Sequence, residues 1–247
     1  MRVVSWNIRA GGGRRAAAIA AQLVEWRPDV VVLGEFRATP PSLWLGAALG
    51  DLGLRHQALT TDAADPARNA LLLASRWPLR QRRVRAAPGE PGKWALVRVD
   101  SPLPFHLGAM HIPNEVTKRK WPFMEAFSAT AAAWRAGPAL FIGDTNSGRS
   151  IADEENAVFG ARYDAWFDGL ARARWTDAFR HIHGARREFT WYAPNSGNGF
   201  RIDQAFVNRA MLRRLRSVAH AWGASRESTR RDALSDHAAL IVDFSDD

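Results

Sequence analysis

The sequence predicts an α/β protein folded as one continuous domain over residues 1–247. Strand-like and helix-like stretches alternate along the whole chain, with no long linker, low-complexity tract or repeat. Of the 247 residues, 47% are hydrophobic and 24% are charged, which is typical of a folded protein with a buried core. The chain has no Cys, which excludes disulfides, thiolate metal sites and cysteine nucleophiles.

The first predicted unit is a strand, a helix and a second strand. Arg2–Ile8 is a short apolar strand. Arg14–Trp26 has apolar residues at helical spacing and contains no helix breaker, which predicts a helix. A turn at Pro28-Asp29 separates it from Val30–Leu33, a fully apolar strand.

The remaining elements continue this alternation. Two helices are predicted, at Val116–Trp134 and Tyr163–Ala171. Strands are predicted at Ala70–Ser75, Trp94–Val99, Phe105–Met110, Ala139–Ile142, Phe189–Tyr192, Ile202–Val207, Val218–Trp222 and Ala238–Phe244.

The chain is strongly basic, with a net charge of +9 and a pI of about 11.1. Of its 34 basic residues 31 are arginine, which nucleic-acid binding and a GC-rich genome explain equally well. Two clusters contain no acidic residue: Arg76, Arg80, Arg82, Arg83 and Arg85, and Arg209, Arg213, Arg214 and Arg216. The charge alone therefore fits a nucleic-acid surface and a solvated surface alike.

The sequence contains no targeting or membrane segment that we recognise. No run approaches eighteen apolar residues, and the N-terminus enters a core strand without the apolar segment of a signal peptide. We therefore expect a cytoplasmic protein with no membrane attachment.

Polar residues stand where predicted strands begin or end, where sheet proteins place functional sites, and two of them, Asn7 and Asp203, lie within predicted strands. Any one of them has a structural explanation, such as a turn, a helix cap or a hydrogen-bonded core histidine. Together they predict a site, because carboxylates among apolar strand residues are costly unless they are paired or metal-bound. The set is Asn7, Glu35, His111, Asp144, Asn146, Asp203, Asp236 and His237.

These residue types favour metal-assisted attack of water on a phosphate ester. Amide and carboxylate oxygens suit Mg²⁺ or Mn²⁺ better than zinc. Nucleotide-loop, serine-hydrolase and zincin motifs are absent from the sequence. The Gly11-Gly12-Gly13 run resembles a phosphate-binding loop but lacks the spacing of a dinucleotide fingerprint.

The ordered motifs resemble those of the endonuclease/exonuclease/phosphatase superfamily. They are Ser5-Trp-Asn-Ile8, Leu33-Gly-Glu35, His111-Ile-Pro-Asn114, Ile142-Gly-Asp-Thr-Asn146, Arg201-Ile-Asp203 and Ser235-Asp-His237. Three further segments resemble motifs of one branch of this superfamily, the exodeoxyribonuclease III branch of abasic-site endonucleases. They are Trp175-Thr-Asp-Ala-Phe-Arg180, Phe189-Thr-Trp-Tyr192 and Gly199-Phe-Arg-Ile-Asp203.

The resemblance implies a four-layer α/β sandwich, in which two mainly antiparallel or mixed sheets pack face to face between helices. It also implies roles for the polar residues. Asn7 and Glu35 would hold the metal, with Asp236 as a direct or water-mediated ligand. Asp144 would position or deprotonate water, Asn146 would bind a phosphate oxygen, and His237, oriented by Asp203, would contact the scissile phosphate and take part in proton transfer. Whether Asp144 or His237 is the base stays open.

Some positions depart from the branch. His111 stands where the branch usually has tyrosine and is similar to pancreatic-type DNases, in which this histidine is assigned as a general acid. Arg9 is also DNase-like. Trp191 and Phe200 stand where relatives stack on a flipped sugar, although packing under the Asn195–Gly199 turn explains them equally well. The expected substrate contacts are Arg9, Asn114, Trp191, Phe200 and Arg201.

The resemblance therefore predicts a Mg²⁺- or Mn²⁺-dependent DNA phosphodiesterase, acting as an abasic-site endonuclease, a 3′–5′ exonuclease or both. We expect DNA as the partner, a monomer and no obligate protein partner. An alternative is a related enzyme acting on small-molecule or lipid phosphoesters. A catalytically silent nucleic-acid binder would lack site residues, and none is missing from the motifs.

Overall fold

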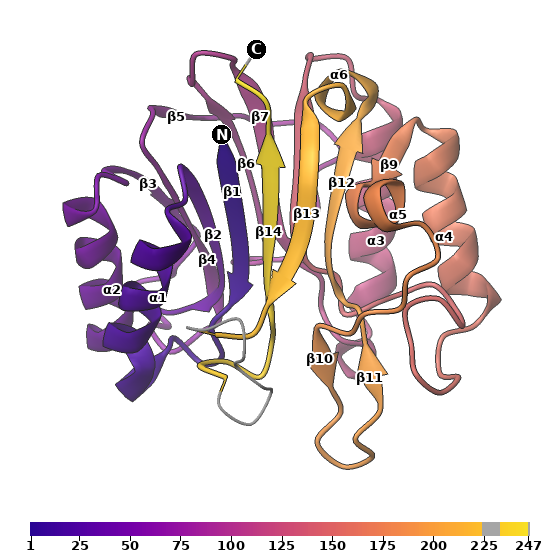
Figure 1. The fold of residues 1–247 in the computed structure, drawn as a ribbon, viewed down its shortest axis with the longest axis horizontal. Coiled ribbons are helices and arrows are strands. Elements are labelled where there is room, and N and C mark those ends of the chain that lie inside the picture. The colour runs from indigo at the N-terminus through magenta and orange to yellow at the C-terminus, as the bar shows by residue number, and fades with distance from the viewer. Residues whose placement is uncertain (224–232, 247) are drawn as a thin grey trace.

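Two sheets pack face to face, with helices on the outer face of each (Figure 1). The computed structural model describes residues 1–223 and 233–246. The first sheet has the order β13 (Leu215–Ala221), β14 (Ala239–Phe244), β1 (Arg2–Asn7), β2 (Val30–Phe36), β4 (Ala70–Ser75) and β3 (His56–Leu59). The second has the order β5 (Leu79–Gln81), β6 (Trp94–Val99), β7 (Phe105–His111), β8 (Ala139–Asp144), β12 (Asp203–Asn208) and β9 (Trp175–Asp177).

The outer layers are formed by two helix pairs. Helices α1 (Ala16–Trp26) and α2 (Pro40–Asp51) cover the first sheet, and α3 (Lys120–Ala132) and α4 (Ala161–Arg172) cover the second (Figure 1). The shorter elements are η1 (Gly13–Arg15), η2 (Glu115–Thr117), α5 (Ala178–His183), α6 (Arg209–Leu212) and the hairpin of β10 (Trp191–Tyr192) and β11 (Gly199–Phe200). The predicted four-layer α/β sandwich is confirmed.

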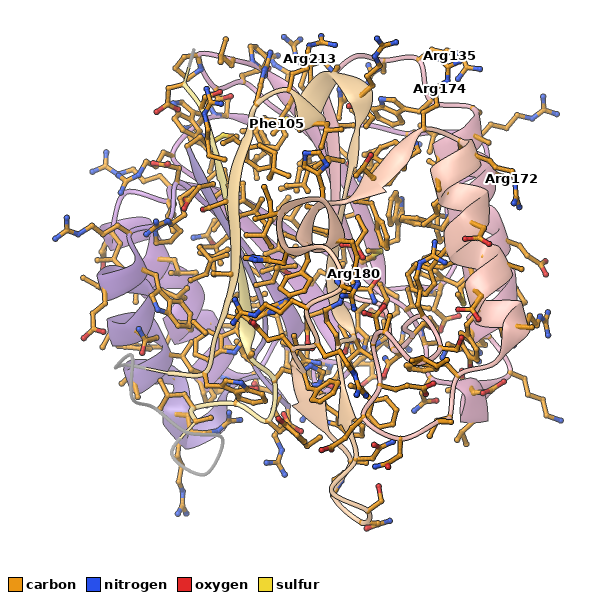
Figure 2. All side chains as sticks on the ribbon, turned by 45° about the vertical axis from the view of Figure 1, so that its right-hand side comes forward. Phe105, Arg135, Arg172, Arg174, Arg180 and Arg213 are labelled. Atoms are coloured by element: carbon orange, nitrogen blue, oxygen red, sulfur yellow. The ribbon has the colours of Figure 1, made fainter. Side chains whose placement is uncertain are left out.

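Three hydrophobic cores hold the layers together. Side chains of alternating direction explain why the strands are apolar on both faces: Val3 and Val32 face the other sheet, whereas Val4 and Leu33 face α1 and α2. Phe105, labelled in Figure 2, lies fully buried in the core between the sheets. The third core, between the second sheet and α3 and α4, is rich in aromatic side chains.

Strand direction brings the polar residues to one end of the sandwich. In the first sheet β1 runs parallel to β2 and antiparallel to β14, so the last residues of β1 and β2 lie beside the start of β14. In the second, β7 runs parallel to β8, which is antiparallel to β12. His111 is therefore paired with Asp144, which is paired with Asp203.

The predicted elements are observed with small shifts, and several others were not predicted. The helix predicted at Val116–Trp134 is split into η2 and α3. Helix α2 was missed because Pro40-Pro41 and two glycines in its sequence are typical of a loop; the structure uses the prolines in the first turn, where they are tolerated. No helix among the described residues is both long and apolar enough to cross a membrane.

Candidate active site

Asp144 is the centre of the polar cluster at this end of the sandwich. Its position depends on Gly143, whose φ is +147° and at which an added Cβ would lie 1.9 Å from the Met110 carbonyl oxygen. Only glycine allows this close approach of β8 to β7. The glycine before Asp144 in the motif therefore has a steric reason, and it fixes where the carboxylate lies.

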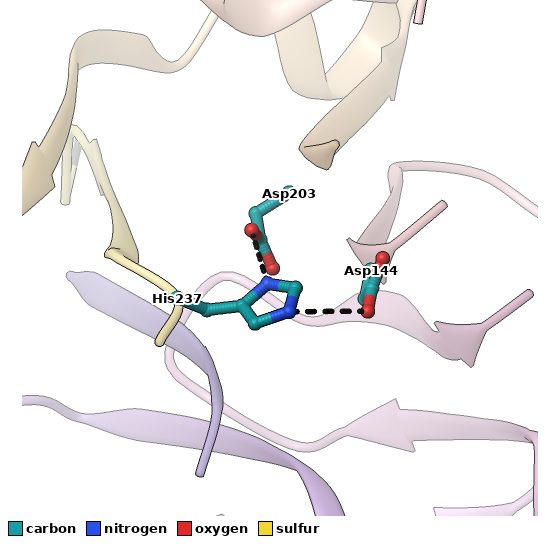
Figure 3. A group of neighbouring side chains, drawn as sticks. All are labelled: Asp144, Asp203 and His237. Atoms are coloured by element: carbon teal, nitrogen blue, oxygen red, sulfur yellow. Dashed lines mark hydrogen bonds and ion pairs between the residues drawn. The ribbon is translucent and has the colours of Figure 1, made fainter. Parts of the chain in front are cut away.

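The Asp144 carboxylate is buried and surrounded by nitrogen atoms. It accepts hydrogen bonds from the backbone N–H of Asn146 at 2.8 Å and from Asn7 Nδ2 at 3.1 Å. His111 Nε2 lies 3.8 Å from its Oδ2. His237 Nε2 lies 4.0 Å from the same oxygen (Figure 3). Burial raises the pKa of Asp144, although the two histidines oppose this shift. A carboxylate with a raised pKa is a better proton acceptor than an ordinary one.

His237 forms an ion pair with Asp203 behind it. The Nδ1–H of His237 donates to Asp203 Oδ2 at 2.9 Å, as Figure 3 shows. Burial alone would lower the pKa of His237, but Asp203, with help from Asp144 and Asp236, raises it to about 9. Trp6 Nε1 donates to the His237 carbonyl oxygen and fixes the backbone. At neutral pH His237 is thus an imidazolium whose Nε2–H points towards Asp144.

This ion pair should stabilise the fold less at high pH. Because the pKa of His237 is raised from 6.5 to about 9, its stabilising contribution is complete below about pH 6.5 and is lost as the pH rises through about 9. In EDTA, the difference in unfolding free energy between wild type and Asp203→Asn should shrink over this range by up to about 1.4 kcal/mol per pH unit. Urea titrations at several pH values measure it, and a constant difference would contradict the assignment.

Asn7, Glu35 and Asp236 offer the oxygen atoms that could hold a divalent cation. Glu35 has a φ of +55° at an irregularity in the pairing of β2 with β4, which turns its carboxylate to the end of the sheet. Asn7 Nδ2 lies 3.4 Å from Glu35 Oε1, and Glu35 and Asp236 line the same cleft. This hard donor set fits Mg²⁺ or Mn²⁺. Asp144, Asp203 and His237 also lie close enough to share an ion, but the His237–Asp203 ion pair already occupies two of them.

The Gly11–Gly13 loop supports Glu35. The backbone N–H of Ala10 donates to Glu35 Oε2 at 2.8 Å, and that of Gly11 donates to the Glu35 carbonyl oxygen at 2.8 Å. Ser42 in α2 donates to the Gly11 carbonyl oxygen. The loop thus holds a carboxylate in place. Its glycines are explained by their φ values of +73°, +75° and +51°, without a bound phosphate.

Asn146 is held at the edge of the cleft by Lys120, which sequence reasoning missed. Asn146 has a φ of +46°, and its Nδ2 donates to the Ile112 carbonyl oxygen at 2.8 Å. The buried Lys120 Nζ donates to the Asn146 carbonyl oxygen at 2.6 Å. Burial lowers the pKa of Lys120 to about 8. Lys120 therefore fixes the backbone of a predicted catalytic residue.

Lys93, also missed, contacts His111. Because Trp94 pairs with Met110, Lys93 comes opposite His111 one step further along, and its Nζ lies 3.2 Å from His111 Nδ1. Burial, with Lys93 nearby, lowers the pKa of His111 to about 4 despite Asp144. His111 is therefore neutral at pH 7 and carries its proton on Nε2, facing Asp144. This geometry favours a hydrogen-bond donor over the general acid suggested by the DNase resemblance.

Lys93→Met should lower kcat by about 10- to 100-fold, because it removes one charge-assisted hydrogen bond that fixes the His111 tautomer. Lys93→Arg should retain part of the activity. The pKa of His111, followed by NMR in EDTA, should rise in Lys93→Met because the nearby positive charge is gone. An unchanged kcat with an unchanged His111 pKa would show that the contact has no positioning role.

The cluster opens into a cleft of about 360 Å³. Asn114 and the half-buried Trp191 line it, and the Trp191 ring lies 6.2 Å from the His237 ring. Arg9 lines an adjoining pocket and its Nε lies 3.8 Å from Asp236. Phe200 is only 7% exposed, and its ring packs on those of Phe159 and Trp191. These contacts fit the packing explanation, in which Phe200 supports Trp191.

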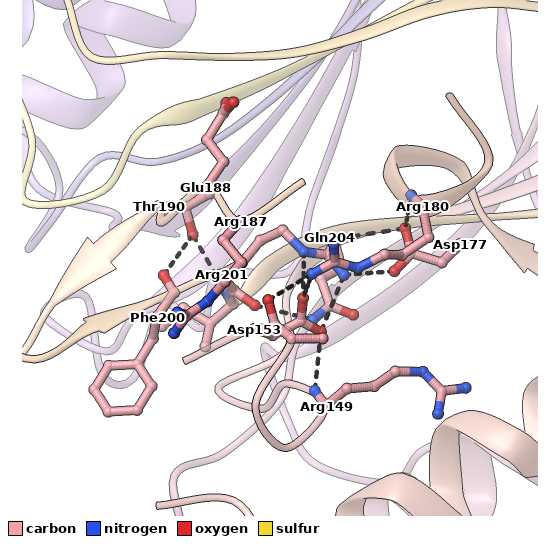
Figure 4. A network of polar contacts seen from close by, with 12 residues as sticks. Arg149, Asp153, Asp177, Arg180, Arg187, Glu188, Thr190, Phe200, Arg201 and Gln204 are labelled. Carbon is pink, nitrogen blue, oxygen red and sulfur yellow. Dashed lines mark hydrogen bonds and ion pairs between the residues drawn. The ribbon is translucent and has the colours of Figure 1, made fainter. Parts of the chain in front are cut away.

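The predicted substrate contact of Arg201 is wrong. Its side chain is fully buried, away from the cleft, and binds Asp153 and Asp177 through Nε and Nη2 at 2.7 and 2.6 Å (Figure 4). Burial opposes the charge of Arg201, but the two carboxylates more than offset this and raise its pKa. Arg201 is a structural residue that anchors the start of β12.

Thr190 links the two halves of the histidine–aspartate pair. Its buried Oγ1 accepts from the backbone N–H groups of Ile202 and Asp203, both at 3.1 Å. Its carbonyl oxygen accepts from Ala238 N, next to His237, at 2.8 Å. Figure 4 shows Thr190 between the hairpin strand of Phe200 and β12. The threonine of the Phe189–Tyr192 motif therefore positions Asp203 and His237.

The fold and this cluster define a phosphoric-ester hydrolase, and a family comparison agrees. The model of the Endonuclease/Exonuclease/phosphatase family matches residues 4–237. The chain belongs to this family.

Solved structures share the fold over almost the whole chain. A 3′-phosphatase from Neisseria bound to product DNA hairpin is 21% identical, with a TM-score of 0.80 and 99% of each chain covered. A 3′–5′ exonuclease from Neisseria meningitidis is 22% identical, with a TM-score of 0.81 and coverage of 99% of this chain and 100% of the other. An AP endonuclease from Archaeoglobus fulgidus is 16% identical, with a TM-score of 0.81 and 99% of each chain covered. No curated protein matches the chain.

Proposed function

We propose that this protein is a divalent-metal-dependent DNA phosphodiesterase that cuts at abasic sites, removes nucleotides from 3′ ends, or does both. The observation that supports this most is the buried Asp144 carboxylate, flanked by His111 and by the His237–Asp203 pair at one end of the sandwich. The structures that share this fold include enzymes named for action on DNA, and the +9 charge favours a polyanionic substrate.

In the proposed reaction Asp144 is the base. A water oxygen attacks the phosphorus atom, its proton passes to Asp144, and the bond from phosphorus to the leaving ester oxygen breaks. His237 is already protonated at neutral pH, so it cannot accept this proton; its Nε2–H instead donates to a non-bridging phosphate oxygen as charge builds. The neutral His111 and the amide of Asn146 provide further donors around the same position.

The proposed metal residues are Asn7, Glu35 and Asp236, with Mg²⁺ or Mn²⁺ as the cation. When bound, the cation would neutralise negative charge on the phosphate and the leaving oxygen. Asn7 Oδ1 accepts from the Arg9 backbone N–H at 3.0 Å while its Nδ2 faces Glu35 and Asp144, so Asn7 would hold the cation through the second lone pair of Oδ1.

A gel assay on end-labelled duplexes tests the proposal. One duplex is intact and one contains a single abasic site, and each is incubated with Mg²⁺, Mn²⁺ or EDTA. We expect metal-dependent products from wild type and none in EDTA. A single cut at the abasic site would assign a repair endonuclease, and a ladder from the 3′ end would assign an exonuclease.

The substrate proposal fails if neither duplex is cut in any metal. Phosphate release from small-molecule and lipid phosphoesters would then be measured, because the same cluster can hydrolyse other phosphate esters. Binding to DNA in EDTA without turnover of any ester would indicate a catalytically silent binder.

A further inference from the structure

A basic surface lies at the end of the sandwich opposite the active site. It is an open hollow of about 660 Å³, which we call the arginine concavity. Its charged lining consists of Arg135, Arg172, Arg174, Arg209 and Arg213. Figure 2 shows Arg135, Arg174 and Arg213 together at the upper end of the molecule, with Arg172 just below, and the β10–β11 hairpin at the lower end.

The strands separate this hollow from the active site. Gly137 and Asn208, at the start of β8 and the end of β12, line the concavity, whereas Asp144 at the other end of β8 lines the cleft. The six residues of β8 span about 17 Å. The two openings share no lining residue, so a ligand in one does not use the contacts of the other.

The positive charge of the concavity is not neutralised within the described part of the chain. Its lining contains no Asp or Glu, and no described carboxylate forms an ion pair with Arg172, Arg209 or Arg213. Other arginines do pair; Arg149 and Arg162 bind Asp168 and Glu125. Arg135 and Arg174 likewise form no ion pair with a described carboxylate, so the five guanidinium groups around the hollow repel one another unless an anion lies among them.

Helix ends explain only part of this arrangement. Helices α3 and α4 end at the concavity, where cations stabilise the last carbonyl groups. Arg135 does this, since its Nη1 donates to the carbonyl oxygens of Ala132 and Trp134. Arg209 is the first residue of α6 and Arg213 directly follows its last, and no carbonyl contact involves their side chains in the described structure.

The lining favours a chain of phosphates over a peptide. Between the arginines stand the short side chains of Ala132, Ala173 and Ala210, which offer no pocket for an apolar anchor. Guanidinium groups bind phosphate oxygens in pairs of parallel hydrogen bonds. The half-buried Trp134 forms part of the floor, with its ring packed against His106, Phe141 and Trp175.

We propose that the arginine concavity binds the phosphodiester backbone of a nucleic acid strand, at a site separate from the catalytic cleft. The site would hold a second nucleic acid segment while the cleft is engaged. This binding does not depend on which phosphate ester the cleft hydrolyses, because the concavity and the cleft share no lining residue.

Equilibrium binding of a labelled single-stranded DNA in EDTA, over a series of salt concentrations, tests the proposal. The test variant is Arg172→Gln/Arg209→Gln/Arg213→Gln, which removes exposed side chains with no side-chain hydrogen bond in the described structure. The control is Arg55→Gln/Arg82→Gln/Arg83→Gln, which removes the same charge from exposed positions outside both openings. Thermal unfolding confirms that both variants are folded.

We expect the test variant to bind more weakly, and its negative slope of log affinity against log salt to become shallower by about 2, because three phosphate contacts are lost. The control should keep a slope close to wild type. An equal loss of DNA affinity in the two variants would mean that only the overall charge of the protein matters, and it would overturn the proposal. So would displacement of the DNA by an acidic peptide of equal charge from wild type but not from the test variant, which would assign the concavity to a protein partner. Because no cleavage is measured, the result does not depend on the proposed function.

Discussion

Asp144→Asn is expected to lower kcat on the DNA substrate by about 10³-fold, the range of a lost general base. The amide keeps the size of the carboxylate and an acceptor for the Asn146 N–H, but it cannot take a proton from water. His237 cannot replace it, since its pKa of about 9 leaves it protonated at neutral pH. Initial rates on the cleaved duplex, with metal in excess, measure the effect.

The same variant should be at least as stable as wild type in EDTA. The pKa of Asp144 is raised by burial, which means that folding disfavours its charged form at neutral pH. Removing the charge therefore removes the free-energy cost of burying a charged carboxylate. Active-site residues often lower stability in this way in return for activity. Thermal unfolding tests this, and a large fall in Tm would mean that lost activity reflects misfolding.

The matched control is Asp168→Asn on the outer face of α4. Asp168 is 52% exposed and pairs with Arg149 at 2.8 Å, so it has a similar ion pair but no contact with the cleft. Its kcat should stay within about twofold of wild type, because exposed ion pairs contribute little. If Asp144→Asn cut DNA as fast as this control, another group would have to be the base.

The sequence contained enough information to predict the centre of the site, because strands place their ends predictably. Asn7, Asp144 and His237 each stand at the end or start of an apolar strand, and parallel and antiparallel pairing brings such ends together. The order of the two sheets did not follow from periodicity. The resemblance implied only that two sheets pack face to face, and the strand order was not predicted, because strand patterns do not say which strands become neighbours.

The supporting residues depend on registers that a single sequence does not contain. Lys93 reaches His111 only because β6 pairs with β7 in one register, and Thr190 reaches Asp203 only after the hairpin folds back. One signal was present, however. The chain has three lysines against 31 arginines, and Lys93 and Lys120 both contact site residues. A compact ammonium fits positions where a guanidinium fork is too large.

Arg201 shows the opposite failure, in which a motif was correct and the role was wrong. Arg201 belongs to the Arg201-Ile-Asp203 motif and was expected to contact the substrate, but β12 begins at Asp203, and Arg201 and Ile202 before it are buried. The guanidinium there closes a buried group of charges with Asp153, Asp177 and Arg180. Burial cannot be judged from the motif, because arginine is usually exposed.

Arg201→Met is expected to destabilise the fold by about 3–5 kcal/mol, a fall in Tm of roughly 6–20 °C for a domain of this size. The substitution keeps the volume approximately but leaves Asp153 and Asp177 with one arginine, Arg180, to neutralise them. Asp153 is completely buried, so its charge has no access to water. Urea and thermal unfolding measure the loss, with Arg98→Met as the control because Arg98 is 46% exposed and pairs only at the surface.

Two further measurements separate this cause from simple loss of packing. Adding Asp177→Asn to Arg201→Met should restore part of the stability, since it removes one of the uncompensated charges.

The pH dependence of stability is the second measurement. In wild type Asp153 is buried, but Arg201 and Arg180 hold its pKa below the ordinary 3.8, so its contribution to stability is present above about pH 4 and is lost as the pH falls further. In Arg201→Met, Asp153 stays buried but has lost one of its two arginine partners, so its pKa should rise. The loss of unfolding free energy relative to wild type should therefore become smaller in mild acid, where Asp153 is protonated. A deficit independent of pH, unaffected by Asp177→Asn, would mean that Arg201 stabilises the fold through its packing on Phe179, whose ring lies 5.0 Å away, and not through its pairing with the two carboxylates.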